Sequence, residues 1–463
     1  MQATPLHGVT VLPEFFQVEG VDAVLDRLAA AGVNAVTTSP YVMEEADEKT
    51  GTREPPDDAG AGNVRLLDRP LWGKKSLFVR TAPSFMPNRA IYQGLRYQPA
   101  ALTELTRREG GVIQRVIRAC QSRHIRIYLQ VQAAIPPGYR VQFGGPTPED
   151  QPRLPDGSIP ARRVSKNGSL ASPAIRDYQH ALILDLVRQY PEIDGLRFDW
   201  PEYPPYFLSD VFLDFSSHAE AAAKRMGFDF TAMKNAARGL WNDLHKLTDD
   251  DLSDAGVERL LARRPELANW LRFKARLVEE LLAGFRAAMN EAGAPKMAMM
   301  PNAFPPPWSK VSGMDFALAA KHSDAIAVKH YTMHWSMMLR FYADDLRQWN
   351  PKLSPKLLGP ALVKLLDMVD GGSSPSADDF HYPGPDEPHL VGSEALQRKI
   401  QQARQEAGAT PILPLAHGYG PIADFTRRLT AAAQSSPHGF WINRYGYLSG
   451  EKIRVIGQIV KSL

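Results

Sequence analysis

The sequence contains one cysteine, Cys120, among 463 residues. A single thiol excludes an intrachain disulfide framework and any zinc site built from several cysteines. The chain also lacks an apolar run close to the roughly 18 residues that a membrane-spanning helix needs. Its first residues, MQATPLHGVTVLPEFF, lack the basic start and long apolar stretch of a secretory signal. We therefore expect a cytoplasmic protein with no membrane partner.

An excess of charge of either sign is missing as well. The 54 Lys and Arg residues nearly balance the 51 Asp and Glu residues, which leaves a formal charge of +3. Such a balance gives no basic footprint for nucleic acid, so no nucleic-acid partner is expected. With 44% apolar and 23% charged residues, the composition is that of a globular protein and excludes wholesale disorder. The 38 prolines favour many fixed loops over a helical bundle.

Short apolar segments alternate with amphipathic ones along the chain. Helical periodicity is present at 20–31, 108–123, 174–189 and 421–433, and it dominates 208–292. Eight further segments have the composition of buried strands: 7–13, 34–40, 126–132, 194–200, 296–304, 324–332, 410–417 and 439–446. Parallel strands need crossover connections, so this alternation indicates a parallel sheet.

Eight such units predict an α/β fold, a (β/α)8 TIM barrel, formed by one elaborated domain over residues 1–463. An open, doubly wound sheet is the alternative. No glycine-rich dinucleotide fingerprint follows the first strand, which weakens that alternative, and we expect no cofactor. Long insertions in the βα loops are predicted at 41–107, 133–172 and 371–390, the last with a composition typical of a disordered loop.

Active sites of such barrels lie at the carboxyl ends of the strands. In the segment 194–200, alternate side chains share a face, so Arg197 and Asp199 should point inward while Leu196, Phe198 and Trp200 pack on outer helices. A nearby cation favours the ionised carboxylate that a nucleophile or base requires. Glu202 follows after Pro201 and could donate the proton in glycoside hydrolysis. The alternative is an Arg–Asp pair in the barrel core, with Glu202 solvated.

Other polar and aromatic residues gather at predicted strand ends and in the adjoining loops. Flat aromatic side chains stack on the apolar faces of sugar rings, although ordinary core packing is the alternative for each of them. Loop residues Arg140 and Gln142 are also candidates for substrate contact. The predicted substrate-binding set is Arg197, Glu14, Gln130, Gln132, Tyr139, Trp200, Tyr203, Asn302, Trp308, His330, Tyr331, Trp335, His417 and Arg444.

His330 and His334 have the i, i+4 spacing of a helical metal site, but His330 is expected in a strand. Three or four converging ligands are not evident in the sequence, so we expect no metal. Lys329 could act as a charge clamp or as a Schiff-base lysine, and the sequence shows no apolar pocket to lower its pKa.

The segment PEIDGLRFDWPEYP at 191–204, preceded by SLASPAIRDYQHALILDLVRQY at 169–190, resembles the fourth-strand region of glycoside-hydrolase-like TIM-barrel families. KHYTMHW at 329–335 is similar to their sixth-strand segment. The spacing of Arg197 and Asp199 resembles the Arg-x-Asp of the alpha-amylase clan, and more distantly the whole is similar to alpha-amylase and beta-galactosidase barrels. The resemblance covers strands three to eight and implies that Asp199 is the nucleophile. It departs at the fifth strand, where Asn302 stands in place of the glutamate of the amylase pattern.

The sequence thus favours a glycoside hydrolase or transglycosidase, with a small glycoside or oligosaccharide as carbohydrate substrate. Asp199 and Glu202 are the predicted catalytic residues. One alternative is a metal-assisted sugar isomerase or epimerase that uses Glu14, Asp199, Glu202 and a histidine as ligands. Another is a non-catalytic carbohydrate-binding barrel, because fold alone does not confer activity. A homo-oligomer is compatible with each of these three functions.

Overall fold

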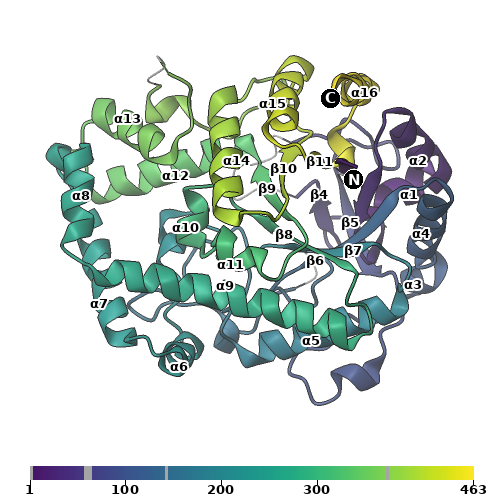
Figure 1. Cartoon of the computed structure of the whole chain (residues 1–463), viewed down its shortest axis with the longest axis horizontal. Helices are drawn as coiled ribbons and strands as arrows, with labels where there is room; N and C mark the ends of the chain where they lie inside the picture. The colour runs from purple at the N-terminus through teal and green to yellow at the C-terminus, as the bar shows by residue number, and fades with distance from the viewer. Residues whose placement is uncertain (1–3, 57–64, 141–143, 372–374) are drawn as a thin grey trace.

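The computed structural model describes residues 4–56, 65–140, 144–371 and 375–463. Its centre is a closed barrel of parallel strands in the order β1-β11-β10-β9-β8-β7-β6-β2 (Figure 1). The (β/α)8 prediction is confirmed, and the open-sheet alternative is wrong because β1 pairs with β11. All eight predicted strands are present: β1 (Leu6–Thr10), β2 (Ala35–Thr38), β6 (Arg126–Gln132), β7 (Gly195–Asp199), β8 (Ala298–Ala303), β9 (Ile326–His330), β10 (Ile412–His417) and β11 (Gly439–Asn443).

Helices surround the barrel, as the apolar outward faces of its strands require (Figure 1). The predicted helices at 20–31, 108–123, 174–189 and 421–433 are confirmed, and 208–292 forms four helices. The helices that pack around the barrel include α2 (Val21–Ala30), α4 (Val112–Ser122), α5 (Pro173–Gln189), α9 (Glu266–Glu291), α11 (Phe316–Ala320), α14 (Ser393–Ala407), α15 (Ile422–Ser435) and α16 (Gly450–Ser462). Further helices are α3 (Glu104–Glu109), α6 (Ser217–Met226), α7 (Phe230–Leu244), α8 (Asp254–Ala262), α10 (Trp308–Ser312), α12 (Thr332–Trp349) and α13 (Pro355–Leu366).

Two segments are more regular than the sequence indicates. Helix α1 (Pro13–Glu19) begins directly after β1, with proline in its first turn, where a missing N–H costs nothing. The 41–107 insertion contains a three-stranded antiparallel sheet in the order β3-β5-β4, formed by β3 (Tyr41–Ala46), β4 (Thr52–Glu54) and β5 (Leu77–Pro83). Charged residues in β3 and β4 conceal the alternation that would have predicted these strands.

The third insertion is also packed where the structure describes it. Phe380 and Ala377 are fully buried, and the side chain of His389 is buried as well. The expectation of a disordered loop is therefore wrong for residues 375–390, because apolar side chains anchor this segment to the main core. Among the residues described, no helix has the length and apolar character to cross a membrane.

The predicted alternation in β7 is confirmed. Phe198 faces outward and stacks on Phe285 of α9, with ring centroids 4.3 Å apart. Arg197 faces inward, and its guanidinium lies 4.1 Å from the ring centroid of Trp441 on β11. An apolar layer fills the barrel interior, formed by Ala35, Tyr128, Met300, Ala325, Ala327, Leu413, Leu415 and Trp441. Polar inward-facing residues of β6 to β9 come after this layer along the strands, so the polar end of the barrel is its carboxyl end.

The tight interior predicts a sharp response at Gly8 of β1. A Cβ atom there would lie 2.2 Å from Cε3 of Trp441. We expect Gly8→Ala to lower the free energy of unfolding by about 1–3 kcal/mol, because overfilling a packed core forces its neighbours to shift. Gly284→Ala on α9 is the control, since nothing lies within 4 Å of its Cβ position. The control should raise stability by roughly 0.5–1 kcal/mol. Urea unfolding followed by circular dichroism measures both, and an unchanged Gly8→Ala variant would contradict the interior packing.

Candidate functional site

A carboxylate, an ammonium group and two amides meet at the carboxyl end of the barrel. Asp199, the last residue of β7, has a side chain that is 16% exposed. Its Oδ1 lies 2.8 Å from Nζ of Lys329 on β9 and accepts a hydrogen bond of 3.3 Å from Nδ2 of Asn302 on β8. Asn302 Nδ2 also donates to Oε1 of Gln130 on β6, at 3.2 Å. Four adjacent strands therefore fix the position of one partly open carboxylate.

Arg197 lies one layer deeper and acts on Asp199 through Asn302. It is fully buried, and its Nη2 donates to Asn302 Oδ1 at 2.7 Å. Burial lowers the pKa of Arg197 to about 10, although Tyr331 and Asp199 favour its charged form. The predicted inward orientation of Arg197 is confirmed. The direct cationic partner of Asp199 is Lys329 rather than Arg197, because the side chain of Asn302 lies between Arg197 and the carboxylate and bonds both.

Lys329 is held between aromatic rings. Its Nζ lies 5.4 Å from the ring centroid of Trp200 and 4.9 Å from that of Phe304. Trp200 has φ of +53°, a backbone conformation that is rare for a residue with a large side chain. This conformation turns Trp200 out of the inward and outward alternation that was predicted for 194–200. A Schiff base requires a free amine, whereas this ammonium group is paired with a carboxylate. The geometry therefore favours the charge-clamp interpretation of Lys329.

Glu202 is fully enclosed behind the mouth. Its Oε1 accepts a hydrogen bond from the Phe304 backbone N–H at 2.7 Å, and its Oε2 accepts one from the Ser312 hydroxyl. Burial raises the pKa of Glu202 to about 7, against the opposing charge of Lys329. The carboxyl thus keeps its proton to near neutral pH, as a proton donor must. Its burial rules out the alternative of a solvated side chain, while the donor role itself stays a prediction.

A second acidic pair is buried under two arginines. Glu14, on α1, is fully buried, and its Oε2 accepts a hydrogen bond of 3.0 Å from the Tyr41 hydroxyl. Its Oε1 lies 3.8 Å from Nη1 of Arg140 and 4.0 Å from Nη2 of Arg444. Both arginines bond Glu54, which the sequence analysis did not identify. Burial raises the pKa of Glu14; it also opposes ionisation of Glu54, but the two arginines outweigh it and lower that pKa. Only the three-stranded sheet brings Glu54 here, so no local signal could have found it.

His417 and Tyr331 also face the mouth. The inward set of β10 contains Leu413, Leu415 and His417, and the His417 ring meets Tyr331 edge-on with centroids 5.1 Å apart. Nδ1 of His417 accepts a hydrogen bond of 3.1 Å from the Tyr419 backbone N–H. Burial holds the pKa of His417 well below its usual value, so the ring is neutral. The mouth therefore combines a charged pair with neutral hydrogen-bonding and aromatic groups.

Several predicted site residues are packing residues in the structure. His330 alternates with Lys329 and faces the helices, where its ring meets Trp335 edge-on at 5.7 Å. Burial lowers the pKa of His330 to about 3. Trp335 in turn contacts Trp308, with centroids 5.4 Å apart. Substrate contacts of His330, Trp308 and Trp335 stay predictions, and the burial of these side chains does not favour such contacts.

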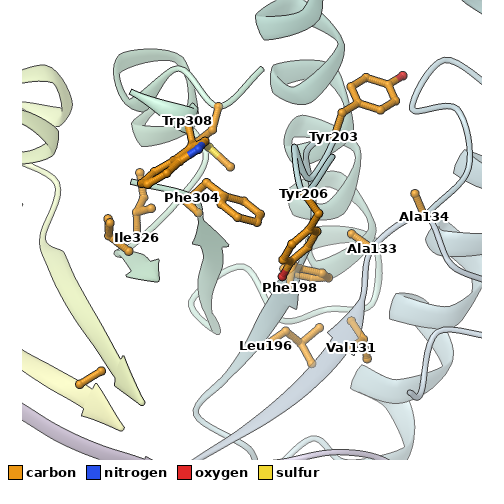
Figure 2. Close-up of a cluster of buried hydrophobic side chains, with 14 of the residues drawn as sticks. Val131, Ala133, Ala134, Leu196, Phe198, Tyr203, Tyr206, Phe304, Trp308 and Ile326 are labelled. Carbon is orange, nitrogen blue, oxygen red and sulfur yellow. The ribbon is translucent and has the colours of Figure 1, made fainter. Parts of the chain in front are cut away.

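Tyr139 and Tyr203 are also buried. The Tyr203 hydroxyl donates to Asp214 Oδ2 at 3.0 Å, and Tyr139 meets Phe85 edge-on at 5.5 Å. Figure 2 shows Tyr203 pointing away from Tyr206 and Phe304. Gln132, at the end of β6, is buried and pairs in register with Asp199. Gln142 lies outside the described residues.

The isomerase alternative needs a set of carboxylate and histidine ligands. Over the part of the chain that the structure describes, no group of three or more His, Cys, Asp or Glu side chains converges as a metal site would require. Glu14 faces arginines and Glu202 faces Phe304 and Ser312, so neither joins Asp199 around a common centre. The arrangement of the ligands therefore does not favour a metal-assisted isomerase.

The buried carboxyl of Glu202 predicts a pH-dependent stability. Below pH 4.5 it is protonated in both the folded and the unfolded chain, whereas between 4.5 and about 7 only the unfolded chain ionises. Stability should therefore fall as pH rises through this window and level off above it. The shift corresponds to ~3 kcal/mol.

Glu202→Gln should remove this contribution, since the amide keeps two hydrogen-bonding atoms and cannot ionise. Urea unfolding of both proteins at pH 4.5 and pH 7.5 measures the difference. Parallel losses of stability in the two proteins would contradict the raised pKa.

A comparison with protein-family models gives no match, and neither does a comparison with curated proteins. Solved structures do match. The catalytic domain of beta-amylase from Paenibacillus polymyxa has a TM-score of 0.51 and 11% identity, with 99% of each chain covered. The beta-galactosidase from Marinomonas ef1 has a TM-score of 0.45 and 10% identity, covering 98% of this chain and 59% of that one. For GH5_18 from Streptomyces cattleya the TM-score is 0.43 and the identity 12%, with coverage of 99% and 80%.

This chain therefore spans somewhat over half the length of the beta-galactosidase and the full length of the beta-amylase domain. At these identities the likeness concerns the fold. The protein is a closed eight-stranded (β/α)8 barrel, and its structural neighbours are glycoside hydrolases such as beta-amylase.

Proposed function

We propose that the protein is a glycoside hydrolase, or a transglycosidase, that cleaves a glycosidic bond of a small glycoside or oligosaccharide at the barrel mouth. The observation that carries this proposal is the Asp199 carboxylate, which is partly exposed at the carboxyl end of the barrel and held by Lys329 and Asn302. The beta-amylase domain has the same fold, which agrees with this function without establishing it.

Asp199 is the proposed nucleophile or base. The ammonium group of Lys329 lies 2.8 Å from its Oδ1 as a direct cationic partner, and the amide at 3.3 Å fixes its orientation. As a nucleophile it would attack the anomeric carbon and form a glycosyl ester; as a base it would take a proton from the attacking water. In either case Lys329 is a positioning residue, because it acts through Asp199.

Glu202 is the proposed proton donor to the departing oxygen. Its pKa of about 7 keeps the proton available near neutral pH. The Ser312 hydroxyl that bonds Glu202 has a second acceptor, the Ser309 carbonyl oxygen at 3.0 Å. A switch of that hydroxyl to the carbonyl would release Oε2 of Glu202, while the Phe304 N–H continues to hold Oε1.

A carbohydrate-binding barrel without catalysis is the second candidate. It is favoured by the complete burial of both Glu14 and Glu202, which leaves Asp199 as the one partly exposed member of the three predicted acidic residues. Glycoside hydrolysis needs two carboxyl groups on either side of the bond that breaks. A barrel that only binds a carbohydrate needs no such pair of carboxyl groups.

Asp199→Asn tests the central claim. We expect the wild-type protein to hydrolyse at least one member of a panel of aryl glycosides and oligosaccharides, and the variant to lose at least 100-fold in kcat. Sugar binding should stay close to wild type, because an amide fits the same space, whereas the unfolding temperature should fall because Lys329 loses its charged partner. Asp177→Asn, at an exposed position of α5, is the matched control, because it makes the same exchange of carboxylate for amide away from the barrel mouth. Sugar binding by both proteins without hydrolysis by either would support the binding barrel.

Glu202→Gln separates catalysis from structure through the leaving group. A proton donor matters for a poorly departing alcohol and little for dinitrophenolate, which leaves without protonation. We therefore expect a loss of about 100-fold on an alkyl glycoside or oligosaccharide and a small effect on dinitrophenyl glycosides. Ser312→Ala is the matched control, because it removes the hydrogen bond but keeps the carboxyl. Equal losses on both classes of substrate would assign Glu202 a purely structural role.

A further inference from the structure

A cavity of 310 Å³ lies among the helices beside the barrel. Its walls come from α7, α8, α10, α12 and α13 and from the 3-10 turns η4 (Leu208–Phe212) and η5 (Asp249–Leu252). Helices α7, α8, α12 and α13 lie on the left side of Figure 1. Leucines dominate the lining, and Asp251 is the one charged side chain among the described residues that form it. Leu240, Leu252, Val257, Ala361 and Leu365 are among its lining residues.

The size of this cavity exceeds what protein interiors leave empty. Interiors pack as densely as organic crystals, with few voids larger than a water molecule. An apolar cavity of about 150 Å³ engineered into another protein stays dry and binds benzene. Natural small-molecule sites begin near 300 Å³. Leu240 and Leu252 remain only half-buried on the walls, so their apolar surface is left for a ligand to cover.

A polar groove between α8 and α13 adjoins the cavity. Cavity and groove share Leu252, Val257, Ala361 and Leu365. The groove is rimmed by four carboxylates and two cationic side chains, so the charge at the opening is negative. These groups are Asp249, Asp250, Asp254, Glu258, Arg259 and Lys364.

Lys364 is already paired with Asp254. The carboxylates of Asp250 and Glu258 are exposed on the same rim. The net negative charge of the rim attracts a cation to this opening and repels an anion. The low-dielectric walls of the groove strengthen both effects.

We propose that this pocket binds a small cationic amphiphile, with its apolar body in the cavity and its ammonium group between α8 and α13. The binding needs no part of the barrel mouth, so it is independent of the proposed hydrolysis. A segment of another protein does not fit the cavity, because a helix with its side chains is about 10–12 Å wide. A second copy of the chain could cover only the rim, where Leu261 and Leu365 are 51% and 55% exposed.

Three eight-carbon probes distinguish the head group by calorimetry: octylammonium, octanol and octanoate. We expect saturable binding of one octylammonium per chain, at least fivefold tighter than octanol, with octanoate weakest. Asp250→Asn combined with Glu258→Gln should reduce octylammonium binding to the level of octanol and leave octanol unchanged. Octanoate binding as tight as octylammonium, or no saturable binding of any probe, would overturn the proposal.

Filling the cavity is the second arm of the test. Ala361→Trp should abolish binding of octylammonium and octanol, whereas Ala29→Trp, at an exposed position of α2, should leave both unchanged. Thermal unfolding confirms that each variant is folded. Undiminished binding by Ala361→Trp would place the probe elsewhere and reject the site. A dimer in sedimentation that dissociates in Leu261→Asp, together with absent probe binding, would assign the face to a second copy and also reject it.

Discussion

A buried guanidinium, which forms no ion pair with any carboxylate of the described residues, organises the carboxyl end of the barrel. Arg197 is fully enclosed, and its neighbours are the face of Trp441 and the amide oxygen of Asn302. An isolated charge in a protein interior is costly unless polar and aromatic groups compensate it. Asn302 therefore has to present its oxygen to Arg197, which directs its amide nitrogen toward Gln130 and Asp199. The orientation of the carboxylate at the mouth follows from the charge beneath it.

The order of layers along the barrel axis has the same origin. Below Arg197 the interior is apolar and tightly filled, and above it the side chains are polar and partly open. Inward residues recur at every second position of a strand, and alternate strands fill the same layer of a (β/α)8 barrel. Lys329 of β9 and Asp199 of β7 reach the uppermost layer from either side of β8 and neutralise each other there. The Asp199 side chain of this pair is 16% exposed, so the carboxylate stays in reach of solvent at the mouth.

The strands, the crossover helices and the inward direction of Arg197 and Asp199 were predictable because they depend on local periodicity. The pairing of Asp199 with Lys329 was not, since 130 residues separate them and only barrel closure brings them together. Glu54 escaped notice because its partners lie on distant segments, and the burial of Glu202 depends on the loop that follows β8. His330 shows the limit most clearly: the residue before it faces the interior, so a shift of one position reverses the environment of a side chain.

The pairing of β1 with β11 joins the first and last strands of the sheet. The ribosome synthesises β1 early and β11 late. One edge of β1 therefore stays unpaired in the nascent chain until residues near 443 have emerged. Contacts of such long sequence separation form slowly. The same seam holds Leu6 beside Gly439 in register, so the loss of this one strand pair would open the cylinder and leave an unpaired edge on each side.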